Sequence, residues 1–359
     1  MSLRYKIRNL TVSILLLILT IMLSFRYGQG SDYFGYQYLV SSYGSFINAI
    51  LNPYHLHGEI GFRALGSMFN GNYKLFITCT SLYEMYMLRR FLILHCENKA
   101  FSLYLFFPTV FLTYYFSAIR QGLVIATFLG IGISLVEKKE WVKYYIMCMI
   151  LISIHSVAFA LLFLPVINTI ELKSILTVGL PLSILIGFFL ATPLSNIILS
   201  RVPIIGYRLA SANRDMSIAA LAERIVTLIF TIVSYLSIKS DVTPGKDPWW
   251  IKAYILGHIF FFVFLAFTNF ATRIFICYKT LEVMFIPNII KHAGKNRQVI
   301  ISYFFLLMIV MYFHNVNGYI AQGGYYENIN IFNYPYINIF DQNRLFEMRN
   351  PVQYFGLIE

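Results

Sequence analysis

The chain is divided into about ten apolar stretches, each close to the length that crosses a lipid bilayer. A helix needs roughly 20 mainly apolar residues to cross ~30 Å of hydrocarbon. Hydrophobic residues make up 58% of the chain and charged residues 12%, which excludes water-soluble, coiled-coil and disordered proteins. We therefore expect an all-α integral membrane protein with about nine to eleven apolar segments. These segments lie near 10–25, 73–94, 100–116, 119–136, 143–165, 175–200, 217–238, 250–268, 271–290 and 299–314.

Basic residues indicate which loops face the cytoplasm. The formal net charge is +12, and cytoplasmic loops of membrane proteins are enriched in Lys and Arg. This rule places the N-terminus, the loop 89–99 and the segment 137–143 in the cytoplasm. It also places the later clusters at 239–252 and 291–297 there, which requires that one apolar stretch between 143 and 200 does not cross the membrane.

Two interpretations of this region satisfy the rule. We prefer a re-entrant pair of short helices over 143–170 that meet near His155, because irregular backbone at membrane depth is tolerated where it lines a polar cavity. The alternative is an interruption of 175–200, which contains Pro181 and Pro193. The first apolar segment is not followed by a small-residue cleavage site, so we expect it to be an uncleaved signal anchor.

The outer-facing parts are then the loops 26–72 and 201–216 and the tail 315–359, which follows a membrane domain over 1–314. The basic residues of these outer parts are almost all Arg, whereas the cytoplasmic clusters are richer in Lys. A guanidinium group binds oxyanions through two parallel hydrogen bonds, and an ammonium group acts as a point charge. The outer face is therefore predicted to bind phosphate. The tail is rich in Asn, Tyr and Gly, which favours an outer cap or a strand-like segment.

Three ionisable residues lie in or beside apolar stretches and are candidates for function, because such groups are costly inside a membrane. Arg120, next to Gln121, and Arg273 each come just after a predicted tight outer turn. Arginines that reach toward lipid head groups are the alternative explanation. His155 lies within an apolar segment, and its alternative is a packing histidine bonded to a neighbouring Ser or carbonyl group.

Carboxylates divide into embedded and outer groups. Glu282 follows Lys279 by three residues, so we expect the two to form an intrahelical ion pair. Asp32 and Glu59 lie on the first outer loop and are candidates for a general base or for binding a sugar hydroxyl. A solvated loop carboxylate is the commoner case for each.

The sequence lacks the motifs that are typical of nucleotide binding, metal-dependent hydrolysis and serine hydrolysis. The chain has no GxxxxGK[ST], HExxH, GxSxG or dinucleotide-binding motif and no carboxylate pair of the kind that holds a metal on a nucleotide sugar. Its four cysteines have no CxxC spacing. We therefore expect no metal, no cofactor and no nucleic-acid partner. A lipid diphosphate is a leaving group that needs no nucleotide, provided that arginines neutralise its developing charge.

A series of short motifs resembles a known family in its order and spacing. Together the motifs look like the EpsG-type branch of the Wzy-like bacterial polysaccharide polymerases, and the resemblance covers about residues 30 to 290. They are Gly30-Ser-Asp-Tyr-Phe-Gly-Tyr36, Gly58-Glu-Ile-Gly-Phe62, Ile119-Arg-Gln-Gly122, His155-Ser-Val-Ala158 and Thr272-Arg-Ile-Phe-Ile-Cys-Tyr278.

The resemblance implies a metal-independent glycosyltransferase with a GT-C-like helical bundle in the bacterial cytoplasmic membrane, its active site on the outer face. Its substrates would be undecaprenyl-diphosphate-linked oligosaccharides of an O-antigen, capsule or exopolysaccharide. A chain-length regulator and a flippase are the expected partners, besides membrane lipids. The implied catalytic residues are His155, Asp32 and Arg120, and the implied diphosphate-binding residues are Arg120, Arg273 and Arg208. The implied sugar contacts are Tyr33, Tyr36, Glu59, Arg63, Gln121, Tyr207 and Tyr278.

Other functions share parts of this pattern. An O-antigen ligase uses the same donor but usually carries a long outer loop late in the chain. A polysaccharide O-acyltransferase also uses membrane-embedded His and Arg. A lipid-linked oligosaccharide flippase binds diphosphate too, although its cations should line a path through the membrane rather than gather on one side.

Overall fold

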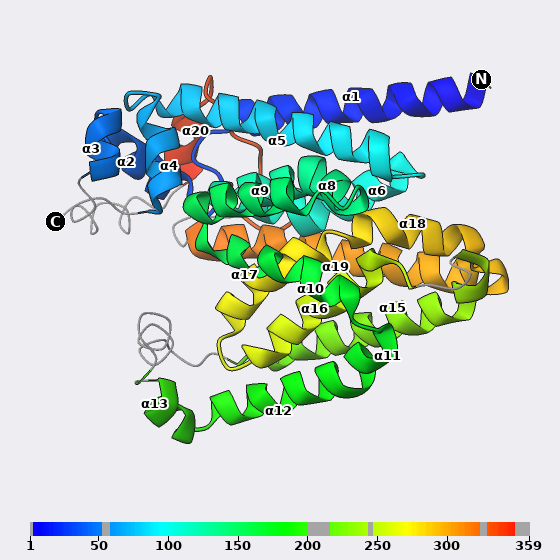
Figure 1. The fold of residues 1–359 in the computed structure, drawn as a ribbon. Coiled ribbons are helices and arrows are strands. Elements are labelled where there is room, and N and C mark those ends of the chain that lie inside the picture. The colour runs from blue at the N-terminus through cyan, green and yellow to red at the C-terminus, as the bar shows by residue number, and fades with distance from the viewer. Residues whose placement is uncertain are drawn as a thin grey trace. The chain divides into compact units, whose positions relative to one another are not determined.

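The computed structural model of the 359-residue chain describes residues 3–51, 58–199, 201, 216–242, 247–323 and 329–348. Within these ranges the chain is helical, without strands, and has one isolated antiparallel bridge between Arg26 and Asn338 (Figure 1). The expected all-α fold is confirmed. Four helical segments of the described part are long and apolar enough to cross a membrane: Ile119–Glu137, Leu172–Ala191, Ile218–Ser237 and Gly294–Ile320. Shorter apolar helices accompany them, and together they fit a membrane protein.

The chain forms two compact units. The first combines Met1–Ser156 with Ile301–Glu359, and the second is Val157–Ile300. The described helices of the first unit are α1 (Leu3–Phe25), α2 (Tyr33–Ser42), α3 (Phe46–Leu51), α4 (Ile60–Ser67), α5 (Tyr73–His95), α6 (Lys99–Phe106), η2 (Phe107–Tyr115), α7 (Ile119–Thr127), η3 (Phe128–Gly132), α8 (Ile133–Glu137), α9 (Trp141–Ile154), α19 (Arg297–Gly323) and α20 (Asn343–Met348).

In the first unit α5 runs along α1 and also packs against α7 (Figure 1). The segment η2 is a π-helix, in which each backbone amide donates to the carbonyl group five residues earlier. The Phe116 amide, for example, donates to Phe111 O at 2.8 Å. Two hydrogen bonds join η2 to helix α19: the Asn315 side chain donates to Pro108 O at 2.6 Å, and the Tyr319 hydroxyl donates to Leu112 O.

The segment after α19 pairs with the chain that follows α1. The Tyr27 amide donates to Ile337 O at 3.0 Å, and the Ile339 amide donates to Phe25 O at 2.9 Å. The Gln29 side chain completes the pairing, because it donates to Pro335 O at 2.6 Å and accepts from the Ile337 amide at 2.8 Å. This part of the tail is thus joined to the first unit by strand-like backbone pairing.

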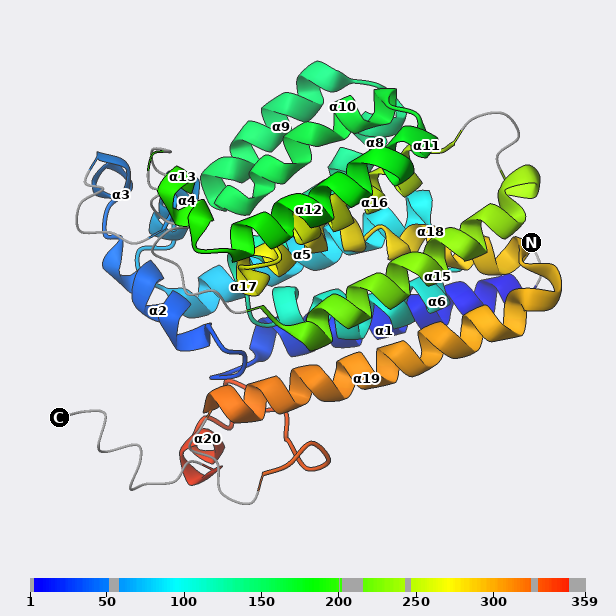
Figure 2. The ribbon, with the colours of Figure 1, turned by 90° about the horizontal axis from the view of Figure 1, so that it is seen from below.

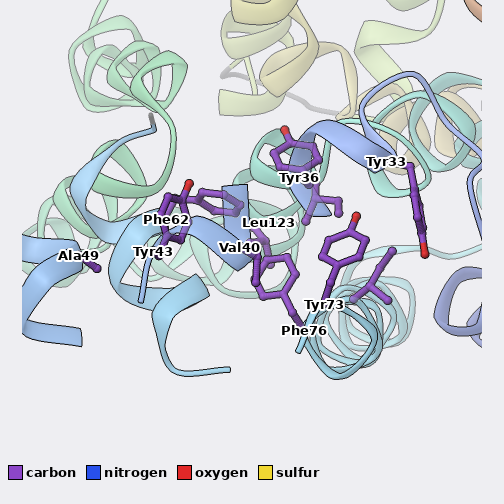
Figure 3. Close-up of a cluster of buried hydrophobic side chains, with 11 residues drawn as sticks. Tyr33, Tyr36, Val40, Tyr43, Ala49, Phe62, Tyr73, Phe76 and Leu123 are labelled. Atoms are coloured by element: carbon purple, nitrogen blue, oxygen red, sulfur yellow. The ribbon is translucent and has the colours of Figure 1, made fainter. Parts of the chain in front are cut away.

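A tyrosine-rich core holds α2, α4 and α5 together. Tyr33, Tyr36 and Tyr73 are almost fully buried in it, and Figure 3 shows their rings between the helices. The rings of Tyr33 and Tyr73 meet edge to face, with centroids 5.1 Å apart. Aromatic pairs of this geometry contribute about 0.5–1.5 kcal/mol beyond their buried area. The core supports the helices that carry the site described below.

The second unit is a bundle in which α12 packs along α16 and α16 packs along α17 (Figure 2). The approach of α12 to α16 depends on Gly187, where a Cβ atom would overlap the carbonyl oxygen of Phe262. The described helices of the second unit are η4 (Ser156–Phe163), α10 (Leu164–Thr169), α11 (Leu172–Ser174), η5 (Ile175–Gly179), α12 (Leu180–Ala191), α13 (Leu194–Leu199), α15 (Ile218–Val242), α16 (Trp249–Val263), α17 (Thr268–Lys279), α18 (Glu282–His292) and η6 (Gly294–Asn296).

The interruption expected near His155 is present. Helix α9 has 14 residues and ends at Ile154, and the backbone of His155 is extended, with φ −152° and ψ 122°. A helix of that length covers about 21 Å, less than the ~30 Å of a bilayer core. The second apolar stretch remains helical from Leu172 to Ala191 despite Pro181, but it is interrupted at Thr192 and Pro193, before α13 begins at Leu194. The break of the alternative interpretation is therefore present as well, at the second of its two prolines.

The prediction of one segment over 271–290 was wrong. The chain turns at Thr280 and Leu281, which separates α17 from α18. The expected ion pair between Lys279 and Glu282 was wrong for the same reason, because their side chains bond to different helices. Lys279 Nζ lies 2.9 Å from Glu223 Oε1 on α15, and Glu282 Oε1 accepts from the Tyr254 hydroxyl on α16 at 2.7 Å.

Candidate active site

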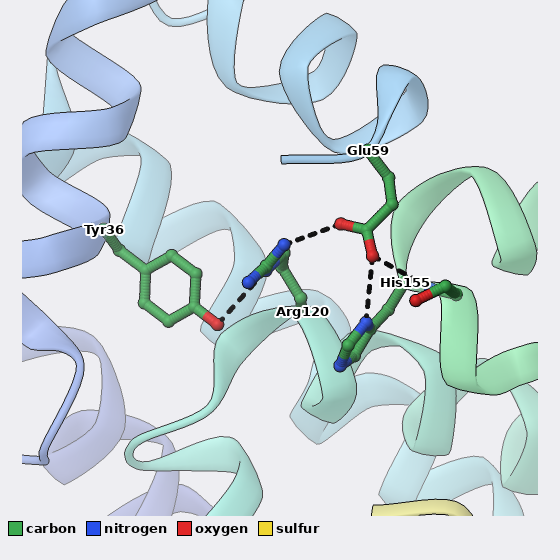
Figure 4. Close-up of polar contacts among 5 residues, drawn as sticks. Tyr36, Glu59, Arg120 and His155 are labelled. Atoms are coloured by element: carbon green, nitrogen blue, oxygen red, sulfur yellow. Dashed lines mark hydrogen bonds and ion pairs between the residues drawn. The ribbon is translucent and has the colours of Figure 1, made fainter. Parts of the chain in front are cut away.

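Three segments of the first unit bring Glu59, Arg120 and His155 together (Figure 4). Glu59 Oε2 lies 2.6 Å from Arg120 Nη1, and Glu59 Oε1 lies 3.2 Å from His155 Nδ1. The same Oε1 accepts the backbone amide of Ser156 at 3.0 Å. The carboxylate of Glu59 therefore connects the arginine and the histidine, whereas the sequence predicted a general base or a sugar contact for it.

Glycines place Glu59 at the start of α4. Gly58 has φ +102°, a conformation that favours glycine, and a Cβ atom there would lie 3.0 Å from the Tyr43 hydroxyl. Gly61 lets α4 approach α9, because a Cβ atom there would lie 2.8 Å from Ser153 O. The motif Gly58-Glu-Ile-Gly61 is thus explained by packing, and it positions Glu59 beside the end of α9.

Arg120 is positioned by a tight turn. η2 ends at Tyr115, and α7 begins at Ile119, so Arg120 is the second residue of that helix. Gly122 allows α7 to lie against the end of η2, since a Cβ atom there would lie 2.8 Å from Tyr114 O. The turn predicted before Arg120 is confirmed.

The guanidinium group of Arg120 is only partly occupied by the protein. Its Nε donates to the Tyr36 hydroxyl at 3.5 Å, and its carbon lies 5.8 Å from the Tyr36 ring centroid and 5.7 Å from that of Phe62. Rings at this distance stabilise the cation through their negative faces. Among the residues that the structure describes, Nη2 has no hydrogen-bond partner. Arg120 can therefore bind an anion while it keeps its contact with Glu59.

The pKa of Glu59 lies well below its usual value. Burial would raise this pKa, but the hydrogen bonds from His155 and the Ser156 amide and the positive charge of Arg120 outweigh burial and lower it. The carboxylate is consequently ionised at neutral pH. An ionised carboxylate at Nδ1 holds the imidazole in the tautomer that leaves Nε2 able to accept a proton.

The other predicted residues have different surroundings. Tyr33 and Tyr36 belong to the tyrosine-rich core, from which the Tyr36 hydroxyl reaches Arg120. Gln121 and Arg63 are buried, and Asp32 is exposed at the start of α2 without a side-chain cap bond. Among residues not predicted, Tyr43 and the Ser156 amide lie at the site. The signal for Ser156 was its place beside His155, whereas no pattern indicated Tyr43.

Two predicted residues belong to the second unit. Arg273 lies within α17, more than a turn after the bend at 264–267, and is exposed. Tyr278 is buried on the same helix, and its hydroxyl donates to Ala160 O at 2.5 Å. Tyr207 and Arg208 lie outside the described residues. Within the described ranges no group of three or more His, Cys, Asp or Glu could hold a metal ion.

Comparison with known proteins gives one match. The sequence profile of the EpsG family matches residues 9–338, a longer range than the motifs indicated. No curated protein and no solved structure matches the chain. The match supports a polysaccharide-polymerase role in broad terms and, in general, a lipid-linked oligosaccharide as substrate. With nearly its whole length matched, the chain belongs to the EpsG family.

Proposed function

We propose that this protein joins undecaprenyl-diphosphate-linked oligosaccharide units on the outer face of the bacterial cytoplasmic membrane. The observation that carries the proposal is the bridge that Glu59 forms between Arg120 and His155. It sets a group that can accept a proton beside a group that can bind a diphosphate. Transfer of a sugar from a lipid diphosphate requires both.

In the proposed step His155 Nε2 accepts the proton of the acceptor hydroxyl. The oxygen then attacks the anomeric carbon of the donor sugar, a new C–O bond forms, and the bond from that carbon to the diphosphate oxygen breaks. The electron pair leaves with the lipid diphosphate, whose added charge Arg120 stabilises. The donor would be the growing chain and the acceptor an incoming repeat unit.

Glu59 acts as a positioning residue in this scheme. It fixes the imidazole through Nδ1 and the guanidinium through Nη1, so that the two reactive groups keep a defined spacing. We propose that the step needs no metal or cofactor, because His155 and Arg120 together provide the base and the charge stabilisation. Asp32, exposed at the start of α2, is the alternative base.

The proposed sidedness rests on the basic loops of the sequence. They favour a cytoplasmic N-terminus and a cytoplasmic loop before α9, and the turn before Arg120 then faces outward. Arg273 and Arg208 remain predicted contacts of the lipid diphosphate. The predicted contacts of the sugar remain Tyr33, Tyr36, Gln121, Tyr207 and Tyr278. A chain-length regulator and a flippase remain the predicted partners.

The test is deletion of the gene in its host, followed by separation of the surface polysaccharide on a gel that resolves single repeat units. Loss of long polymer, with lipid-linked single units accumulating, is the expected result. Complementation with the wild type should restore the polymer, and complementation with His155→Gln should not. Intact lipid-linked polymer that is no longer attached to core lipid would instead identify a ligase, and unchanged length with altered acetylation an acyltransferase. Accumulation of single units on the cytoplasmic side would identify a flippase.

A further inference from the structure

Arg63 is a buried cation for which the described residues provide no hydrogen-bond partner at Nε. Its side chain lies on α4, and the residue is 5% exposed. Arg26 also has an Nε without a partner, but its other two guanidinium nitrogens donate to the carbonyl oxygens of Leu23 and Tyr115, and Lys279 pairs with Glu223. A buried charge that lacks a partner is unfavourable, so its retention needs a reason outside packing.

Arg63 lies beside the candidate active site. It follows Glu59 by one helical turn, and residues four apart share a helix face. The Tyr43 side chain lies against α4, because a Cβ atom at Gly66 would touch its ring. A Cβ atom at Gly58 would touch the Tyr43 hydroxyl and lie 3.9 Å from Arg120 Nη1, so this hydroxyl lies near Arg120. Burial raises the pKa of Tyr43 to about 12, and the charges of Arg120 and Arg63 oppose that rise. Both guanidinium groups therefore act on the same hydroxyl.

Apart from Asp32, which is exposed at the start of α2, the charges of this region do not balance. Arg63 and Arg120 provide two permanent positive charges, and Glu59 provides one negative charge, which already bonds to Arg120 and His155. A partly buried site with excess positive charge attracts an anion more strongly than an exposed one, because water screens it less. Its planar fork of donors makes Arg63 suited to an oxyanion with two oxygens in one plane.

We propose that Arg63 forms a second oxyanion subsite beside Arg120, which binds a phosphate or carboxylate group of the substrate. The proposal rests on the proposed function, because the substrate there is a lipid-linked saccharide. Two groups of such a substrate have this chemistry: the diphosphate itself and an acidic substituent on the sugar, such as the carboxylate of a uronic acid. In the first case both phosphates are held within the first unit, and in the second the subsite selects acidic repeat units.

The test measures ligand binding to the purified full-length protein in detergent. The probes are inorganic pyrophosphate and glucuronate, and the variants are Arg63→Gln and Arg63→Lys. The matched control is Lys74→Gln, which removes an exposed positive charge from the same unit. We expect Arg63→Gln to weaken one probe about tenfold or more, Arg63→Lys to restore part of the loss, and Lys74→Gln to leave binding unchanged.

The two probes separate the two sources of the anion. A loss confined to pyrophosphate assigns the subsite to the diphosphate, and a loss confined to glucuronate assigns it to an acidic sugar. Equal binding of both probes by Arg63→Gln and the wild type would overturn the proposal. The thermal midpoint without ligand provides a second readout: it should stay the same or rise in Arg63→Gln, since a buried unpaired charge is removed. A large fall would show that Arg63 serves the fold instead.

Failure of this proposal differs from failure of the proposed function. If Arg63→Gln binds both probes normally while His155→Gln abolishes polymer, the polymerase function stands and the subsite does not. If gene deletion leaves polymer length unchanged while Arg63→Gln loses a probe, the subsite stands and the polymerase function does not.

Discussion

His155 Nδ1 lies 3.2 Å from Glu59 Oε1, although 96 residues separate them in the chain. The contact forms where the extended backbone of His155 ends α9 at the N-terminal end of α4. A histidine within a regular helix would have its Nδ1 facing its own helix neighbours. The interruption of α9 therefore gives the imidazole a carboxylate partner.

Replacing Arg120 by Lys should reduce polymer formation by at least about tenfold at a normal level of protein. Lysine keeps the charge and can pair with Glu59, but it lacks the planar fork that also reaches Tyr36 and a substrate oxyanion. Polymer length on gels and immunoblots of membranes provide the measurement. Arg89→Lys, at an exposed arginine of α5, is the control. Full activity of the Arg120 variant would remove the arginine from the mechanism.

Replacing His155 by Gln should lower the polymerisation rate about 100- to 10,000-fold, the usual contribution of a general base. Glutamine can still bond to Glu59 but cannot accept the proton of the acceptor hydroxyl. The rate is measured in membranes supplied with lipid-linked single units. His314→Gln, at an exposed histidine of α19, should remain at the wild-type rate. A rate within twofold of the wild type for His155→Gln would assign the histidine to packing.

Stability should depend on acidic pH through Glu59. Folding lowers its pKa from the usual 4.5, because the bonds from His155 and Ser156 and the charge of Arg120 outweigh burial. A group of this kind contributes stability that is fully present above the unfolded pKa and is lost as the pH falls through the folded pKa.

The advantage of the wild type over Glu59→Gln in unfolding free energy should therefore be constant from about pH 8 to pH 6 and shrink below about pH 4.5. Denaturant unfolding of both proteins in detergent over this pH series is the measurement. A difference that stays constant down to pH 3 would show that folding does not lower the pKa of Glu59.

The buried charges of the second unit give a stability prediction. Glu223 pairs with Lys279 and with Arg224, so Glu223→Gln removes the carboxylate that these two buried cations share. We expect a loss of about 3–5 kcal/mol in unfolding free energy. Lys279→Met should cost less, because Glu223 then keeps Arg224, and the double variant should be more stable than Glu223→Gln alone. If Lys279→Met proves the more harmful single change, this account of the cluster is incorrect.

Glycine packing between α12 and α16 can be tested with a matched pair. Gly187→Ala should destabilise the protein by about 1–3 kcal/mol, because its methyl group overlaps the Phe262 carbonyl and the helices must separate. Gly35→Ala, in α2, has no atom within 4 Å of the added carbon and should be neutral or slightly stabilising. Thermal unfolding of both variants in one detergent measures the difference. Equal midpoints would show that the two helices do not pack through Gly187.

Much of the fold follows from local pattern. Apolar length predicted the helices, and the count of cytoplasmic loops predicted an interruption near His155, which the structure contains. The bend at Thr280 was missed, because hydropathy averaged over 271–290 does not show where buried polar groups find their partners. Lys279 and Glu282 have the spacing of an intrahelical pair, but Glu223 and Tyr254 on two other helices provide their contacts.

The sequence predicted the residues of the candidate site, but it did not predict the hydrogen bonds and ion pairs between them. Arg120 and His155 were identified because an ionisable side chain in an apolar segment is energetically costly. That cost can be judged from the position of each residue in the sequence alone. The role of Glu59 as the link between them depends on packing at Gly58 and Gly61, which is a property of three segments together. Tyr43 gave no signal, because one of many tyrosines in a predicted outer loop has the same pattern whether or not it faces a charge.

The bridge between Arg26 and Asn338 has a consequence for synthesis on the ribosome. The chain after α1 emerges early, but its hydrogen-bonding partners at 335–339 emerge only after the helices up to α19 have been translated. The nascent chain must therefore hold the backbone groups of residues 25–29 unpaired, or paired with water, during insertion of the whole second unit. A ribosome that stops within α19 would release a protein whose first unit contains all of Glu59, Arg120 and His155 and still lacks its closing segment.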